Sequence, residues 1–159
     1  MGVQGAQSSQ WDQVFEEIAA GRAFTRGAKV TGAAGGQAAV EVFNPAGSGK
    51  EVQIIRAYIG TDVAQSVTLV RSAVALGTLI GLGHNLLTGA FDSAAELRVY
   101  TTGPAGLPQI FISNTAPNSH LLALDSWGPN LAPAESYQFV SDIVASVLTV
   151  RFDWIEREA

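Results

Sequence analysis

The chain has 159 residues, of which 47% are apolar and 14% are charged. This length predicts a single domain with a sizeable core, and low charge combined with many Gly, Ala, Thr and Val residues favours a β-sandwich over a long helical protein. The net charge of −5 does not indicate nucleic acid or an anionic membrane as a partner, and the absence of cysteine excludes disulfides and thiolate metal ligands.

The first predicted element is a helix that follows a short polar arm. Residues 1–8 are small and polar, and we expect them to be flexible. Apolar side chains then recur with the 3.6-residue period of a helix over residues 9–20. They are Trp11, Val14, Phe15 and Ile18. An apolar face with two aromatic rings has to dock, either on the chain's own domain or on another subunit.

Basic residues follow this helix closely. Arg22, Arg26 and Lys29 lie within eight positions of one another. They could form a small contact patch for an acidic partner, or they could belong to an ordinary solvated loop. We take these three residues and the apolar helix face as the candidate interaction residues. We interpret residues 1–24 as an N-terminal arm and helix, and residues 25–159 as a single β-sandwich domain.

Strand patterns fill the rest of the chain. The predicted strands lie near residues 28–32, 37–43, 50–60, 65–72, 75–81, 94–102, 109–112, 119–124, 135–141 and 146–155. In the last strand, alternate side chains form one apolar face. They are Leu148, Val150, Phe152 and Trp154. Many short strands with turn signals between them predict a mainly β fold, an antiparallel β-sandwich or jelly-roll-like domain with one short N-terminal helix.

The stretch FNPAGSGK, residues 43–50, has some features of a phosphate-binding loop. That loop needs a Gly five residues before its Gly-Lys pair and a Ser or Thr after the Lys. Asn44 and Glu51 occupy these positions, and a β-branched strand pattern follows where the loop needs a helix. We therefore predict that Lys50 binds no nucleotide, and that residues 44–50 form a hairpin connection between two strands.

No motif for catalysis or metal binding stands out. His84 and His120 lack the spacing of paired metal ligands, and Ser119, His120 and Asp125 lack a nucleophile-elbow sequence. We predict no catalytic residue, no metal and no cofactor, and we expect residues 156–158 to form a solvated tail. The most apolar run, residues 73–87, is shorter than the roughly 18–20 residues that span a bilayer.

Four segments together resemble small β-sandwich structural proteins of tailed bacteriophages. They are GRAF at 21–24, FNPAGSGKEVQIIRA at 43–57, LAPAESYQFV at 131–140 and SVLTVRFDWIERE at 146–158. The resemblance implies a virion structural protein, most specifically a capsid decoration or cement protein that binds the major capsid protein and stabilises the assembled head. It also implies a homotrimer that needs no cofactor and no small-molecule substrate.

An alternative placement on the phage particle stays open. A tail, baseplate or fibre component could use the same fold to bind a host receptor or a carbohydrate. The aromatic residues Tyr58, Tyr100 and Trp127 would then line a groove beside polar groups. A decoration protein would instead have large apolar interfaces with other subunits.

Overall fold

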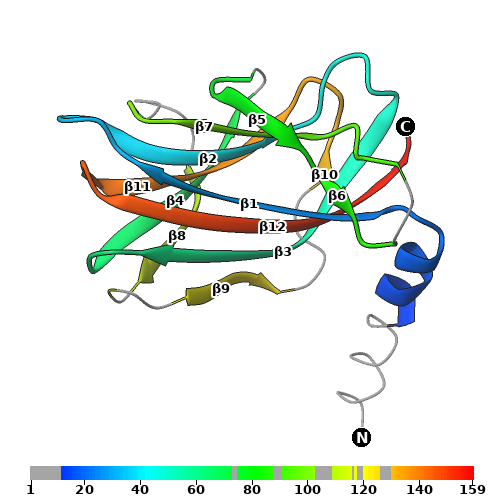
Figure 1. Cartoon of the computed structure of the whole chain (residues 1–159), viewed down its shortest axis with the longest axis horizontal. Coiled ribbons are helices and arrows are strands. Elements are labelled where there is room, and N and C mark those ends of the chain that lie inside the picture. The colour runs from blue at the N-terminus through cyan, green and yellow to red at the C-terminus, as the bar shows by residue number, and fades with distance from the viewer. Residues whose placement is uncertain are drawn as a thin grey trace, which may run out of the picture.

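The computed structural model describes residues 12–72, 75–87, 91–102, 109–115, 117, 120–125 and 130–159. It confirms the predicted fold class, because this part of the chain is mainly β, with two antiparallel sheets stacked face to face and one short helix (Figure 1). The described helix covers residues 12–19, inside the predicted span of 9–20, and stands at one end of the sandwich.

The first sheet, called sheet A, has the strand order β10–β3–β12–β1–β6, and β9 also pairs with β3. Its strands are β1 (Ala23–Thr31), β3 (Lys50–Thr61), β6 (His84–Asn85), β9 (His120–Asp125), β10 (Asn130–Leu131) and β12 (Val147–Glu158). The second sheet, called sheet B, has the order β5–β7–β2–β11–β4–β8. Its strands are β2 (Gln37–Phe43), β4 (Gln65–Ser72), β5 (Thr78–Leu82), β7 (Glu96–Tyr100), β8 (Gln109–Thr115) and β11 (Ser136–Val144).

The order of the strands is that of a jelly roll. Strands β1 to β4 alternate between the two sheets, and the late strands return between them, with β12 between β1 and β3 and β11 between β2 and β4. Strands β8 and β9 complete this double sheet beside β4 and β3. Strands β5, β6 and β7 are additions beside β1 and β2.

The core lies between the sheets and is filled by alternate side chains of both. The predicted inner face of β12 is confirmed, because its four side chains are fully buried. They are Leu148, Val150, Phe152 and Trp154. Trp154 stacks on Phe24 of β1 with ring centres 6.3 Å apart, and Phe152 stacks on Phe139 of β11 at 5.6 Å. The aromatic side chains of β12 thus pack against both sheets.

The structure corrects the predicted connection at residues 44–50. Strand β2 belongs to sheet B and β3 to sheet A, so this segment crosses between the sheets and is not a hairpin. Alternation identifies a strand and its faces, but it does not identify the strand's partner. Similarly, β1 begins at Ala23 and not near residue 28, because Ala23 and Phe24 already pair with Ile155 and Trp154.

Candidate functional site

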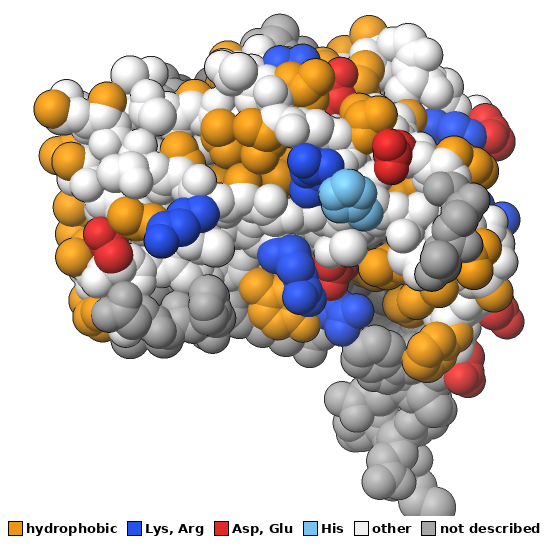
Figure 2. Space-filling view, viewed as in Figure 1, with side chains coloured by type: hydrophobic (Ala, Val, Ile, Leu, Met, Phe, Trp, Pro, Cys, Tyr) orange, Lys and Arg blue, Asp and Glu red, His pale blue; other side chains and the backbone are white. Residues whose placement is uncertain are grey.

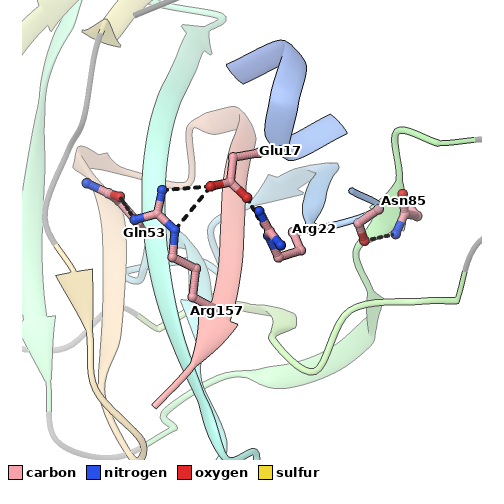
Figure 3. A network of polar contacts seen from close by, with 6 residues as sticks. Glu17, Arg22, Gln53, Asn85 and Arg157 are labelled. Atoms are coloured by element: carbon pink, nitrogen blue, oxygen red, sulfur yellow. Dashed lines mark hydrogen bonds and ion pairs between the residues drawn. The ribbon is translucent and has the colours of Figure 1, made fainter. Parts of the chain in front are cut away.

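A buried glutamate fastens the N-terminal helix to sheet A (Figure 3). Glu17 is only 7% exposed, and one of its carboxylate oxygens accepts a hydrogen bond from Arg22 Nε at 2.5 Å. The other oxygen accepts from Arg157 Nη2 at 2.8 Å and from Arg157 Nε at 3.2 Å. Arg157, near the end of β12, also donates to Gln53 of β3. We call Glu17, Arg22 and Arg157 the helix latch.

The turn after the helix is also fixed. Gly21 has a φ of +70°, a conformation that favours glycine and commonly ends a helix. Asn85 of β6 donates from Nδ2 to the carbonyl oxygen of Gly21 at 2.6 Å (Figure 3). The helix is therefore held at its C-terminal end by β6, as well as along its side by the latch.

The two arginines of the latch determine the charge of Glu17. Burial raises the pKa of the Glu17 carboxyl, but the hydrogen bonds and positive charges of Arg22 and Arg157 outweigh this effect. The pKa of Glu17 therefore lies below its ordinary value of 4.5, and the carboxylate is ionised at neutral pH. Its hydrogen bond in turn raises the pKa of Arg22.

The latch sets which face of the helix meets solvent. Val14 and Ile18 are half-buried on the same side as Glu17. The opposite side has the spacing i, i+3, i+4, i+7 and is exposed throughout. We call its residues, Asp12, Phe15, Glu16 and Ala19, the exposed helix face. Because Phe15 is 63% exposed, the helix presents an aromatic ring between two carboxylates.

Three basic residues gather on the outer face of sheet A, where Figure 2 shows Lys and Arg side chains over β1, β12 and β3. Arg151 of β12 lies opposite Tyr58 of β3, with its guanidinium carbon 4.4 Å from the centre of the tyrosine ring. In the next row of the sheet, Asp153 lies opposite Arg56. Lys29 of β1 is a diagonal neighbour of Arg151. We call Lys29, Arg56, Tyr58 and Arg151 the basic patch.

One buried carboxylate organises the basic patch. Asp153 is 4% exposed and accepts a hydrogen bond from Thr25 Oγ1 at 2.7 Å. Its other oxygen lies 3.3 Å from Arg151 Nη2 and 3.5 Å from Arg56 Nε. One carboxylate thus faces two guanidinium groups, and Lys29 is a further cation on the same face of the sheet. This surface can attract the anionic groups of a partner.

The basic residues predicted as one contact patch do not lie together. Arg22 belongs to the latch and Lys29 to the basic patch. Arg26 instead reaches β5 at the edge of sheet B, where it donates to the carbonyl oxygens of Leu82 at 2.7 Å and Ile80 at 3.2 Å. Successive residues of a strand point to opposite faces, so the odd-numbered Lys29 and the even-numbered Arg26 are on different sides of β1.

The apolar helix face predicted from sequence is also divided. Phe15 is exposed, Val14 and Ile18 are half-buried, and Trp11 lies outside the described residues. The helical period of the sequence indicates all four residues, but it gives no sign that Glu17 takes part in docking. The signal that could have found it is a glutamate on a helix followed by arginine five residues later.

Asn44 stands where a phosphate-binding loop has its first glycine, and it has a structural role in the connection at residues 44–50. Asn44 is buried, and its Nδ2 donates to the carbonyl oxygens of Lys50 at 2.7 Å and Leu131 at 3.1 Å. Lys50 begins β3, as the strand pattern predicted, and its ammonium group pairs with Glu158 of β12.

A hollow of about 440 Å³ opens between the end of the helix and the ends of β3 and β12. Phe24 and Phe91 line it, with ring centres 6.5 Å apart. Its Arg22 and Lys50 side chains are paired with Glu17 and Glu158, so their charges are balanced within the chain. The hollow is therefore lined by two aromatic rings together with charged side chains that are paired within the chain.

A second buried polar network was not predicted from the sequence. Glu41 of β2 is fully buried and accepts hydrogen bonds from the backbone N–H groups of Leu76 and Gly77 and from Gln138 Nε2. The hydroxyl of Tyr100 donates to Gln138 Oε1. Burial raises the pKa of Tyr100, and the negative charge of Glu41 raises it further. Alternation places Glu41 on the outer face of sheet B, but it does not show that another segment covers that face.

The aromatic residues proposed for a carbohydrate groove are divided between the sheets. Tyr58 is in β3 of sheet A, and Tyr100 is in β7 of sheet B. Trp127 lies outside the described residues. The two described tyrosines therefore do not line one groove.

The candidates for metal binding and catalysis are only partly described. His84 of β6 lies 3.1 Å from Arg26, while Ser119 and the side chains of His120 and Asp125 lie outside the described residues. Within the described part of the chain, no group of three or more His, Asp or Glu is placed to hold a metal, and no helix is long and apolar enough to cross a membrane.

Comparison with protein-family models, with curated proteins and with solved structures finds no match to this chain. Among the described residues, the exposed helix face and the basic patch are two surfaces on which exposed aromatic or charged side chains stand together.

Proposed function

We propose that this chain is a structural protein of a tailed-phage particle, and that it decorates and stabilises the assembled head. Support from the fold is an analogy, because jelly rolls recur in viral capsid domains but a fold alone does not imply a function. The observation that carries the proposal is the exposed helix face, in which Phe15 is 63% exposed on a helix that Glu17 holds in place. Exposed aromatic side chains on a fixed element suit contact with another protein subunit.

The major capsid protein and further copies of this chain are the partners that this function requires, and the virion is its place of action. A protein that binds the assembled shell and not its free subunits shifts the assembly equilibrium towards the shell. A trimer would join several weak contacts at high effective concentration, so each contact could be weak by itself. The proposed function includes no cofactor and no small-molecule substrate.

Heads purified from the phage that encodes this chain provide the test. Full-length protein is sedimented with these heads, and the melting temperature of the heads is measured with and without it. We expect saturable binding and a higher melting temperature. Phe15→Ser should weaken the binding, whereas Phe91→Ser, which changes a ring of similar exposure (70%) elsewhere, should bind like the wild type.

A folded protein that does not bind intact heads would contradict head decoration. Recovery of the chain from purified tails would instead favour the alternative placement, in which a tail, baseplate or fibre component binds a receptor or carbohydrate. Equal loss of binding in both Phe variants would show that the exposed helix face is not the contact.

A further inference from the structure

Sheet A has an open edge along most of β1. The short strand β6 pairs only near the start of β1 (Figure 1). Beyond it, over residues 27–31, the described part of the chain places no strand beside β1 on the side away from β12. Gly27, Lys29 and Thr31 are exposed there. Such an edge offers unpaired backbone groups to another strand.

The register of β1 shows which backbone groups point out of this edge. Arg22, just before the strand, and Gly32, just after it, both form backbone hydrogen bonds on the side of β12. Because this pattern repeats every two residues, the even-numbered residues of β1 bond to β12, and the odd-numbered ones direct their N–H and C=O groups away from it. In the open edge these are Gly27, Lys29 and Thr31, and their outward groups take part in none of the backbone hydrogen bonds between described residues.

Strand β5 of sheet B overhangs the open edge. Strand β1 packs against β2 and β7, and β5 is the next strand beyond β7. Thr78 of β5 pairs with Val99, whose side chain packs on the core, so Thr78 lies on the face towards sheet A, and yet it is exposed. Arg26 ties β5 to β1 by donating to the carbonyl oxygens of Ile80 and Leu82. The two edges are thus held in place, and sheet A lacks a strand opposite β5 in the row that β6 begins.

We propose that residues 27–31 of β1 bind an extended segment of another protein, which adds a strand to sheet A opposite β5. The side chains of this segment beside Ala28 and Val30 face β5 and are apolar, because these two residues point towards the core. The side chain opposite Lys29 is acidic, since Lys29 is exposed and has no ion pair among the described residues. The partner segment therefore has an acidic residue between two apolar ones.

A second copy of this chain does not fit the site as well. If two β1 edges met antiparallel and centred on each other, Lys29 would lie opposite Lys29 of the second copy, and like charges directly opposite are unfavourable. Residues 1–11 contain no acidic residue that could face Lys29. The helix stands at the end of the sandwich, away from residues 27–31, so the inference does not rest on the head contact proposed above.

NMR spectroscopy of the full chain, labelled with nitrogen-15 and titrated with two synthetic peptides, tests the site. The peptides are Ser-Thr-Val-Glu-Val-Thr-Ser and the same sequence with Lys in place of Glu. The Glu peptide should shift the amide signals of Gly27, Lys29 and Thr31 more than those of Ala28 and Val30, whose N–H groups already bond to β12. It should bind about fivefold more tightly than the Lys peptide, and Lys29→Glu should reverse this preference.

Thr31→Pro tests the backbone contact separately from the charge. It removes an outward N–H and leaves the hydrogen bonds to β12 in place, and proline is tolerated at such an edge position. It should weaken binding of the Glu peptide by about fivefold, whereas the control Thr31→Val keeps the N–H and should bind like the wild type.

Three results would overturn the inference. They are amide signals that do not move at millimolar peptide, shifts without alternation along residues 27–31, and equal binding of the two peptides. Association of wild-type chains with each other through the amides of Gly27, Lys29 and Thr31 would also overturn it, because the occupant would then be a second copy. If Thr31→Pro does not fold, the reversal expected in Lys29→Glu still decides.

Discussion

Replacing Glu17 by Gln removes the charge of the helix latch and keeps the size of the side chain. Glu17 accepts three hydrogen bonds from two guanidinium groups. The side chains of Arg22 and Arg157 are 49% and 47% exposed, so solvent screens part of their attraction to the carboxylate. We therefore expect a loss of about 1–2 kcal/mol for the whole latch, below the sum for three charge-assisted bonds in a fully buried site.

This loss should appear as local opening of the helix. A change of about 1–2 kcal/mol alters the ratio of docked to undocked helix by about 5–30-fold. The eight helical residues described here are too few to stay helical in water without docking, so undocking exposes their amides to exchange. Hydrogen–deuterium exchange measured by mass spectrometry, at low protein concentration and neutral pH, should show exchange over residues 12–22 about 5–30-fold faster in Glu17→Gln.

Glu16→Gln is the matched control for this experiment. It makes the same change of charge on the same helix, but on the exposed face, and it should exchange like the wild type. Equal exchange in the two variants would refute the latch, and would mean that the apolar contacts of Val14 and Ile18 and the hydrogen bond from Asn85 are enough to hold the helix. The free energy of global unfolding in urea should change little in Glu17→Gln, because the helix lies outside the core between the sheets.

Three further predictions concern the latch in acid, the core and the loop at residues 44–50. Because the folded state lowers the pKa of Glu17 below 4.5, the latch contributes fully above about pH 4.5 and is lost as the pH falls through the lower folded value. Helix exchange, corrected for the intrinsic rate, should rise there in the wild type and not in Glu17→Gln. A Cβ at Gly83 would lie 2.2 Å from the ring of Trp154, so Gly83→Ala should lower the free energy of unfolding in urea by about 1–3 kcal/mol. Gly47→Ala is the control, because a Cβ at Gly47 has no atom within 4 Å, and its free energy of unfolding should stay within about 0.5 kcal/mol of the wild type. Calorimetry with ATP and Mg²⁺ should show no heat of binding to the wild type, because we predict that Lys50 binds no nucleotide. A heat of binding that is present in the wild type and lost in Lys50→Ala would contradict this prediction.

The fold class could be predicted because burial in a sandwich leaves a period of two in the sequence. Leu148, Val150 and Phe152 alternate with polar residues, and all three are fully buried. The pairing of strands leaves no such signal. Turn residues at 44–50 indicate a reversal of the chain, but they do not distinguish a hairpin from a crossing between sheets. The two-residue strands β6 and β10 are too short for any period to show.

The candidate surfaces were less accessible to prediction, because each depends on contacts between distant parts of the chain. Arg157 binds a glutamate 140 positions earlier, although residues 156–158 were expected to be a solvated tail. Arg56 and Arg151 meet around Asp153 only because β3 and β12 pair in one particular register. Periodicity within a segment finds a helix or a strand, but it cannot find such partners.

The charged latch has a consequence for docking that apolar contacts alone would not have. Burying a carboxylate is unfavourable unless it is paired, so Glu17 is a costly way to attach a helix that already has Val14 and Ile18. Apolar burial is non-directional and would allow the helix to rotate until Phe15 was also covered. The guanidinium groups of Arg22 and Arg157 bind the two carboxylate oxygens from fixed directions, and this geometry admits one rotation of the helix. That rotation turns Phe15, Asp12 and Glu16 outwards, so the latch gives up some stability to present the surface that we propose contacts the assembled head.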